Sequence, residues 1–254
     1  MNIYEAVFKR MSVRSYRMDA VSTPILEAIS NYHREVQGLF GKNEAEVAIV
    51  DNHLGQQKTL GLFGIRAPYY LLIYSLDGEK AVMNVGYVVQ QTALYICSKG
   101  LGSCIINPIS AKKSLQTMNG KRLCGVIAFG RSKNGYLRKA TEAKRLDVGR
   151  LCVYKEKPRL WMKKLLEAAR MAPSSLNSQP WRFVVYDNRI HVFAKGKKGE
   201  QMKLLDELNF GIMFANMMVV AEELWLDVDL IRLEEISQKN FSNSRYILSV
   251  ILRV

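Results

Sequence analysis

The segment Pro173-Ser174-Ser175-Leu176-Asn177-Ser178-Gln179-Pro180-Trp181 joins a predicted helix to a predicted strand in the second half of the chain. Residues 165–170 before it favour a helix, which Pro173 ends because proline disfavours the helical conformation of the preceding residue. Residues 183–186 after it are typical of a strand. The short polar side chains between them can hydrogen bond a ligand, although the same residue types also form ordinary turns.

A second run, Arg10-Met11-Ser12-Val13-Arg14, lies far upstream. In an extended chain, side chains two residues apart share a face, so Arg10, Ser12 and Arg14 would point in one direction. Arginine forks donate charge-assisted hydrogen bonds to phosphate oxygens. A helix would instead pair Arg10 with Arg14 and turn Ser12 away, so an exposed basic helix end is the alternative.

The third run is Gly100-Leu101-Gly102-Ser103-Cys104, which continues through Ile105 and Ile106 to Asn107 and Pro108. Glycines at these positions can end a helix and let the backbone approach a ligand. A plain helix end explains the glycines equally well.

The two halves of the chain carry a weak internal repeat. Asn84-Val85-Gly86 matches Asn209-Phe210-Gly211 at an offset of 209 − 84 = 125 residues, and each begins an apolar stretch that predicts a long buried helix. Residues 125–128 match residues 249–252 as a last strand, and residues 44–51 match residues 180–187 as a strand that ends in Asp. A duplication without a shared site is the simpler interpretation of this repeat.

The pattern predicts an α+β fold with central mixed or antiparallel sheets flanked by helices. We expect a first half over residues 1–150 and a second half over residues 151–254, packed as one unit and divided within the polar stretch 141–158. The predicted strands cover residues 46–51, 69–75, 123–129, 182–187, 190–194 and 245–253.

Composition limits the possible classes of protein. The chain has 254 residues, is 48% apolar and carries a formal charge of +14. We expect a large core, no apolar run long enough to cross a bilayer, no signal peptide and four reduced cysteines, which together favour the cytoplasm. The positive charge favours a solvated basic surface over a nucleic-acid site, because the basic stretches are not interleaved with aromatic residues.

Taken together, the three runs resemble the nitroreductase family, flavoenzymes that hold FMN at a dimer interface. The resemblance implies that Arg10 and Ser12 bind the phosphate and ribityl chain, with Arg14 near the phosphate or the pyrimidine edge of the flavin. It implies that the loop containing Ser174, Ser175, Asn177 and Gln179 contacts FMN from the partner side of the interface. It places Asn107 and Pro108 beside the flavin ring, chiefly through backbone. It also suggests Lys144 and Arg145 on the phosphate, with Arg138, Lys139 and Arg150 left open.

In that family the first two runs lie close together near the N-terminus, whereas here about one domain separates them. Residues 31–36 stand where the first half would carry the polar loop, and residues 157–160 stand where the second half would carry the arginines. The chain therefore resembles a tandem-fused branch of the family, the "putative TM nitroreductase" type. This implies an internal pseudo-dimer that is a monomer with one complete site.

The resemblance implies an FMN-dependent oxidoreductase with a ping-pong cycle. NADH or NADPH would donate the hydride, and a small-molecule acceptor such as a nitroaromatic or a quinone would take the electrons. No catalytic side chain, metal, nucleic acid or membrane partner is expected. The alternatives are a degenerate member that binds flavin, or no flavin, without turnover, and a basic nucleic-acid-binding protein.

Overall fold

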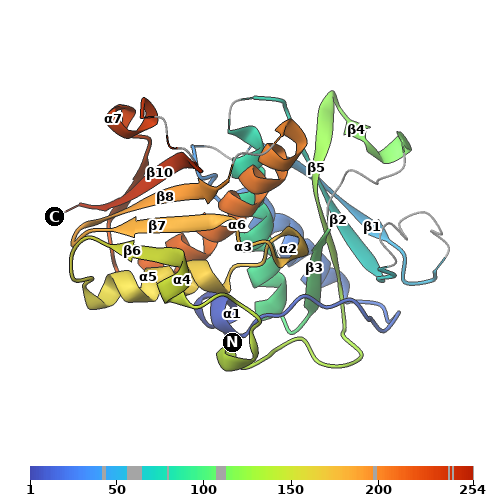
Figure 1. The fold of residues 1–254 in the computed structure, drawn as a ribbon. Coiled ribbons are helices and arrows are strands. Elements are labelled where there is room, and N and C mark those ends of the chain that lie inside the picture. The colour runs from blue at the N-terminus through green and yellow to red at the C-terminus, as the bar shows by residue number, and fades with distance from the viewer. Residues whose placement is uncertain are drawn as a thin grey trace.

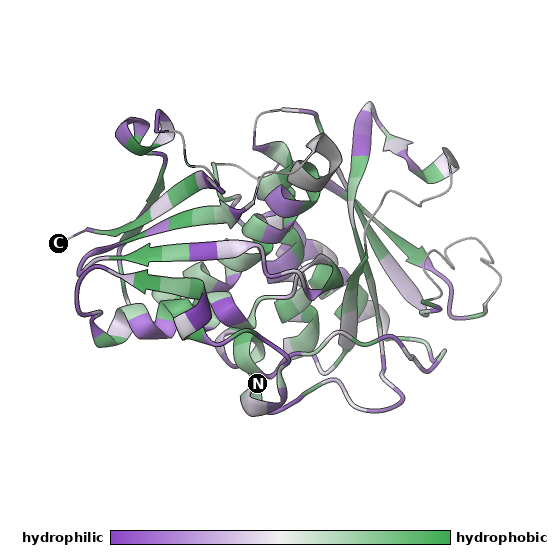
Figure 2. Ribbon diagram, viewed as in Figure 1, coloured by the Kyte–Doolittle hydropathy of each residue, from purple (hydrophilic) through white to green (hydrophobic). Residues whose placement is uncertain are grey.

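A computed structural model describes residues 1–41, 44–55, 65–78, 80–106, 113–196, 199–239, 241 and 243–253. Two β-sheets lie on opposite sides of a central pair of helices, α3 (Ala81–Ser98) and α6 (Glu200–Glu223) (Figure 1). Hydrophobic residues follow the strands and these helices, whereas hydrophilic residues gather in the loops (Figure 2). The α+β class is confirmed.

The first sheet has the strand order β1-β2-β5-β3, with every pair antiparallel. Its strands are β1 (Glu46–Asp51), β2 (Tyr69–Ser75), β5 (Lys121–Gly130) and β3 (Gly102–Ile106), with the short β4 (Thr117–Met118) on β5. Six of the seven residues of β2 are buried, as expected for its aromatic and aliphatic sequence between two neighbouring strands.

The second sheet has the order β6-β7-β8-β10-β9, in which only the pair β6 and β7 is parallel. Its strands are β6 (Cys152–Tyr154), β7 (Trp181–Val185), β8 (Arg189–Lys195), β10 (Ser244–Leu252) and β9 (Val228–Ile231). The order β7-β8-β10-β9 repeats the order β1-β2-β5-β3 of the first sheet. All six predicted strands are present. Four further strands, β3, β4, β6 and β9, lie outside the predicted ranges, and each is at most five residues long.

The two central helices pack closely at Gly86 of α3 and Gly211 of α6. A Cβ on Gly86 would lie 2.2 Å from the carbonyl oxygen of Leu208, and one on Gly211 would lie 1.9 Å from that of Met83. Both glycines therefore allow one helix backbone to approach the other.

Helix α6 corrects one sequence expectation. Its stretch Leu204–Glu223 is long and apolar enough to cross a bilayer, with a mean hydropathy of 1.4, although no such run was expected. The fold buries 78% of that window, as it does in a core helix. Burial against α3 and α5 explains why the stretch is apolar on every side.

The remaining helices cover the two sheets and the central pair. They are α1 (Ile3–Lys9), α2 (Thr23–Glu35), α4 (Val148–Leu151), α5 (Leu160–Met171) and α7 (Glu234–Ser237), with short 3-10 turns at Lys113–Leu115, Ala140–Glu142 and Ser175–Asn177. Helix α1 begins in a capping box formed by Asn2 and Glu5. Helices α1 and α5 both contact α6, which brings the N-terminal segment close to the polar loop of the second half.

The first-half counterpart of the polar loop lies later in the chain than we expected. Residues 31–35 belong to α2, so they do not form a loop. The Oδ1 of Asn84 accepts a hydrogen bond from Leu39 N at 2.6 Å, and the Oδ1 of Asn209 accepts one from Ser175 N at 2.9 Å. Leu39 and Ser175 are 175 − 39 = 136 positions apart, the same offset as between the matching Asp51 and Asp187. The loop after α2 is therefore the first-half counterpart of the polar loop.

Candidate functional site

The run of residues 10–14 is extended. Helix α1 ends at Lys9, and Arg10 has φ −61° and ψ 139°. Ser12 forms a parallel bridge with Ser103, and Val13 N donates to Ser103 O at 3.0 Å, so the segment lies along β3. The alternative of a basic helix end is wrong, because the chain leaves the helix at the first arginine.

Arg10 is buried, with 6% of its surface exposed. Its Nε donates to Ser103 Oγ at 3.1 Å, and its Nη2 donates to Ser103 O at 3.2 Å. These bonds engage Nε and Nη2 and hold the guanidinium at one edge of the first sheet.

The polar loop of the second half has a strained backbone. Leu176, Asn177 and Gln179 have φ values of 54°, 55° and 44°. Asparagine tolerates this left-handed region, whereas leucine and glutamine rarely adopt it. Such strain persists only where surrounding contacts impose it, and it is common at binding sites.

Hydrogen bonds join this loop to the basic tract, residues 138–150, which follows the first sheet. Asn177 Oδ1 accepts from Arg145 Nη1 at 2.9 Å, and Asn177 Nδ2 donates to Lys144 O at 3.0 Å. Gln179 Oε1 accepts from Leu146 N at 2.8 Å. The two amide side chains therefore dock residues 144–146 onto the loop.

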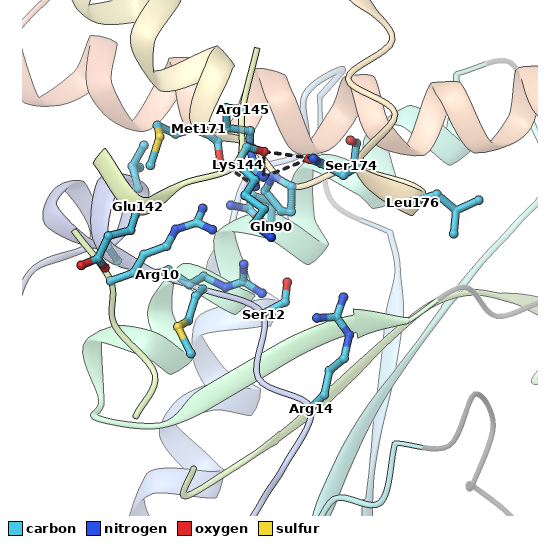
Figure 3. A pocket seen from close by; sticks show the side chains of 16 residues that line it. Arg10, Ser12, Arg14, Gln90, Glu142, Lys144, Arg145, Met171, Ser174 and Leu176 are labelled. Atoms are coloured by element: carbon cyan, nitrogen blue, oxygen red, sulfur yellow. Dashed lines mark hydrogen bonds between the residues drawn. The ribbon is translucent and has the colours of Figure 1, made fainter. Parts of the chain in front are cut away.

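A polar cavity of about 620 Å³ opens between these segments. Arg10, Ser12 and Arg14 line one side, and Lys144, Arg145 and Ser174 line the opposite side (Figure 3). Its wall is completed by residues of α1, α3, α5, the arginine run, the basic tract and the loop, namely Ala6, Val7, Met11, Gln90, Arg138, Glu142, Met171, Pro173, Leu176 and Asn177.

An apolar cavity of about 390 Å³ adjoins the polar cavity and shares Ser12, Arg14, Pro173, Ser174 and Leu176 with it. Its other lining residues are Ile65, Cys104, Ile105, Ile106, Ser175, Leu205, Leu208, Asn209 and Ile212. Together the two cavities form a continuous site with a cationic end and an aliphatic end.

The structure brings most of the predicted residues to this site. The polar cavity is lined by Arg10, Ser12, Arg14, Lys144, Arg145, Ser174 and Asn177. Ser175 lines the apolar cavity. Gln179 lines neither cavity, because its side chain is buried in bonds to Leu146 N and Asn177 O. Asn107 and Pro108 lie outside the described residues.

Four polar residues that line the site were not among the predicted ones, namely Gln90, Arg138, Glu142 and Asn209. Arg138 was one of three cations left open in the basic tract, and its spacing alone could not distinguish it from its neighbours. Gln90 lies in the middle of the apolar helix α3, where the sequence predicts only core. A polar residue within a buried helix was the available signal.

The cationic end of the site has more cations than acids among its described residues. Five cations and one carboxylate, Glu142, are among the described residues that line the polar cavity. Burial lowers the pKa of Arg138 and of Arg145, the latter to about 10, and repulsion from neighbouring arginines lowers both further. Arg138 Nε and Arg145 Nε are also buried without a hydrogen-bond partner among the described residues.

This donor set fits a bound phosphate. Buried N–H groups without an acceptor are costly, and a phosphate dianion would satisfy the two Nε groups through short charge-assisted hydrogen bonds. A flat aromatic group attached to that phosphate would find apolar walls in the adjoining cavity. The residues present therefore fit a flavin mononucleotide.

Comparison with known proteins identifies the family. The model of the family described as "Putative TM nitroreductase" matches residues 2–221, so the chain belongs to this nitroreductase family. The fold is similar to that of a putative nitroreductase from Thermotoga maritima MSB8, with a TM-score of 0.65, 18% identity, and coverage of 99% of this chain and 94% of that one.

Shorter family members overlay part of the chain. A nitroreductase family protein from Clostridium difficile 630 has a TM-score of 0.50 and 15% identity, and covers 62% of this chain and 100% of its own. A nitroreductase with bound FMN from Bacteroides fragilis NCTC 9343 has a TM-score of 0.47 and 20% identity, with coverage of 60% and 98%. Comparison with curated proteins gave no significant match.

Proposed function

We propose that the protein is an FMN-dependent oxidoreductase that uses NADH or NADPH to reduce a small-molecule acceptor. The observation that carries the proposal is a cluster of five cations, with one carboxylate among the described residues, beside an aliphatic cavity in a chain of the nitroreductase family. Nitroaromatics and quinones are the acceptor classes we propose, and the cytoplasm is the proposed compartment.

In this proposal the polar cavity holds the phosphate and ribityl chain. Arg10, Arg138 and Arg145 would bind the phosphate oxygens, because Arg10 is buried and the Nε groups of the other two are buried without a partner among the described residues. Ser12 and Ser174 would bind the ribityl hydroxyls, since a hydroxyl both donates and accepts. Asn177 would act chiefly by holding Arg145, through the bond at 2.9 Å.

The flavin ring would occupy the apolar cavity, where bound FMN supplies reversible hydride chemistry. The aliphatic side chains of Ile105, Leu208 and Ile212 would exclude water from it. Arg14 lines both cavities, so its positive charge would favour the negative charge that the ring gains on reduction. No side chain is required to transfer a proton in this scheme.

We also propose that the chain is a monomeric pseudo-dimer with this one composite site. The repeated strand order and the reciprocal contacts of Gly86 and Gly211 support it. The arginine run comes from the first half and the polar loop from the second, so neither half alone would complete the cavity. A family member that binds flavin without turnover remains the competing function.

The test is an FMN titration followed by reduction under anaerobic conditions. We expect the purified protein to bind FMN with a shifted flavin absorbance spectrum, and NADPH or NADH to bleach that spectrum. Arg138→Gln should weaken FMN binding, whereas Arg131→Gln, on the surface of the same segment, should not. Bound FMN that neither nucleotide reduces would favour the competing function, and absence of FMN binding would refute the proposal.

A further inference from the structure

Gln90 is a buried polar residue that the phosphate site does not explain. It lies in α3, lines the polar cavity and has 1% of its surface exposed (Figure 3). Its Oε1 has no hydrogen-bond partner among the residues that the structure describes. Because a buried acceptor without a donor is destabilising, we expect a bound ligand to donate a hydrogen bond to this oxygen.

A chain of hydrogen bonds determines how the Gln90 amide is oriented. Asn216 Nδ2 donates to the backbone carbonyl of Ala168 at 3.0 Å, and Gln90 Nε2 donates to Asn216 Oδ1 at 2.8 Å. A carbonyl oxygen can only accept, so Asn216 must turn its NH₂ toward Ala168 and its oxygen toward Gln90. The NH₂ of Gln90 must then donate to Asn216, so the Gln90 oxygen can accept a hydrogen bond only from another donor.

The hydroxyls of Ser12 and Ser174 also line the cavity, but among the described residues neither donates to Gln90 Oε1. The arginines and Lys144 only donate hydrogen bonds, and the Oδ1 of Asn177 already accepts one from Arg145. A phosphate offers only acceptors, so it suits the cations and not the Gln90 oxygen. The group that suits Gln90 is a neutral hydroxyl, which can donate.

We propose that Gln90 Oε1 accepts a hydrogen bond from a hydroxyl of the ribityl chain, and that Asn216 is the positioning residue that keeps this oxygen available. The inference rests on the proposed FMN function and adds a specificity determinant to it. Gln90 distinguishes a phosphorylated polyol chain from a phosphorylated chain without hydroxyls. The helix pair α3 and α6 thereby contributes directly to cofactor recognition, through residues 126 apart in sequence.

The experiment compares two flavins by equilibrium titration of flavin fluorescence. One is FMN, and the other is a flavin phosphate in which an unsubstituted pentyl chain replaces the ribityl chain. The wild-type protein should prefer FMN. Gln90→Met keeps the volume and removes the acceptor, so it should reduce that preference about tenfold while leaving the affinity for the pentyl analogue nearly unchanged.

Two further variants separate recognition from structure. Asn216→Leu should also reduce the preference for FMN, because the Gln90 amide is no longer held in one orientation. Gln91 lines a different cavity, near Tyr32 and Tyr95, so Gln91→Met should keep the wild-type preference for FMN. Thermal unfolding of each variant checks that it is folded.

The inference is overturned if Gln90→Met and Asn216→Leu weaken both flavins equally, as a purely structural role requires, or weaken neither. A wild-type protein that binds neither flavin would instead refute the FMN function, and with it this inference. Binding of both flavins with equal affinity by the wild type would refute the inference alone.

Discussion

Gly86 and Gly211 occupy corresponding positions in the two central helices, and each lies against the backbone of the other helix. A Cβ on either one would lie within 2.2 Å of a carbonyl oxygen, from Leu208 or Met83. The residues they meet are themselves 208 − 83 = 125 positions apart, the same offset as the glycines. This reciprocal contact sets how closely α3 and α6 approach, and so the position of Gln90 beside Asn216.

The first prediction concerns these glycines. Gly86→Ala and Gly211→Ala should each lower the free energy of unfolding by about 1 to 3 kcal/mol, because the obstructing atoms are backbone and yield only if the helices separate. Urea unfolding measures the change. Gly149→Ala is the matched control, since a Cβ there meets no atom within 4 Å and should change stability little. Equal effects at all three positions would contradict the close crossing.

The second prediction separates stability from binding at Arg138. This guanidinium is partly buried, repelled by Arg10 and Arg170, and has an unpaired Nε. Arg138→Gln should therefore leave the melting temperature of the FMN-free protein unchanged or higher, while weakening FMN binding about tenfold or more. Differential scanning fluorimetry with and without FMN measures both. A lower melting temperature without FMN would show that Arg138 stabilises the fold itself.

The third prediction concerns acid stability. Burial lowers the pKa of His33 to about 4, below its usual 6.5, so the folded state holds this ring neutral. The unfolded chain binds the proton first, and stability is lost as pH falls from about 6.5 to about 4, by about 3 kcal/mol. His33→Gln should flatten this part of the curve of unfolding free energy against pH.

Urea titrations at several pH values between 4 and 7 test this difference in slope. His191, whose pKa burial also lowers, should account for part of the slope that remains. If His33→Gln loses stability with acid as steeply as the wild type, another group is responsible.

The fourth prediction concerns the strained loop. Leu176 is fully exposed and has a φ of 54°, a conformation that costs a leucine about 1 to 2 kcal/mol. Leu176→Asn and Leu176→Gly should raise the free energy of unfolding by up to about 1 kcal/mol, and Leu176→Val should lower it. The order of the three variants in chemical denaturation is the test. A valine variant as stable as the asparagine variant would mean that the loop relaxes without strain.

Much of the fold follows from local patterns that the sequence displays directly. Strands such as β2 and β5 follow from runs of β-branched and aromatic residues, and the helices α3 and α6 follow from long apolar stretches. The prediction of a polar loop after α5 was also local, because Pro173 restricts the residue before it. The pattern of Arg10, Ser12 and Arg14 alone left open whether this run is extended or helical, and its resemblance to the family motif favoured the extended form. Strands as short as β4 and β6 depend on their partners and leave no such pattern.

The sequence by itself therefore determined the elements and the chemical character of the two main segments of the site. Only the tertiary structure decided which cations share one cavity, that Asn177 and Gln179 hold the basic tract, and that Gln90 reaches the site from a core helix. The physical reason is distance along the chain. Propensity and periodicity report on residues a few positions apart, whereas these contacts join residues 32 to 126 positions apart, and packing between helices and sheets selects them.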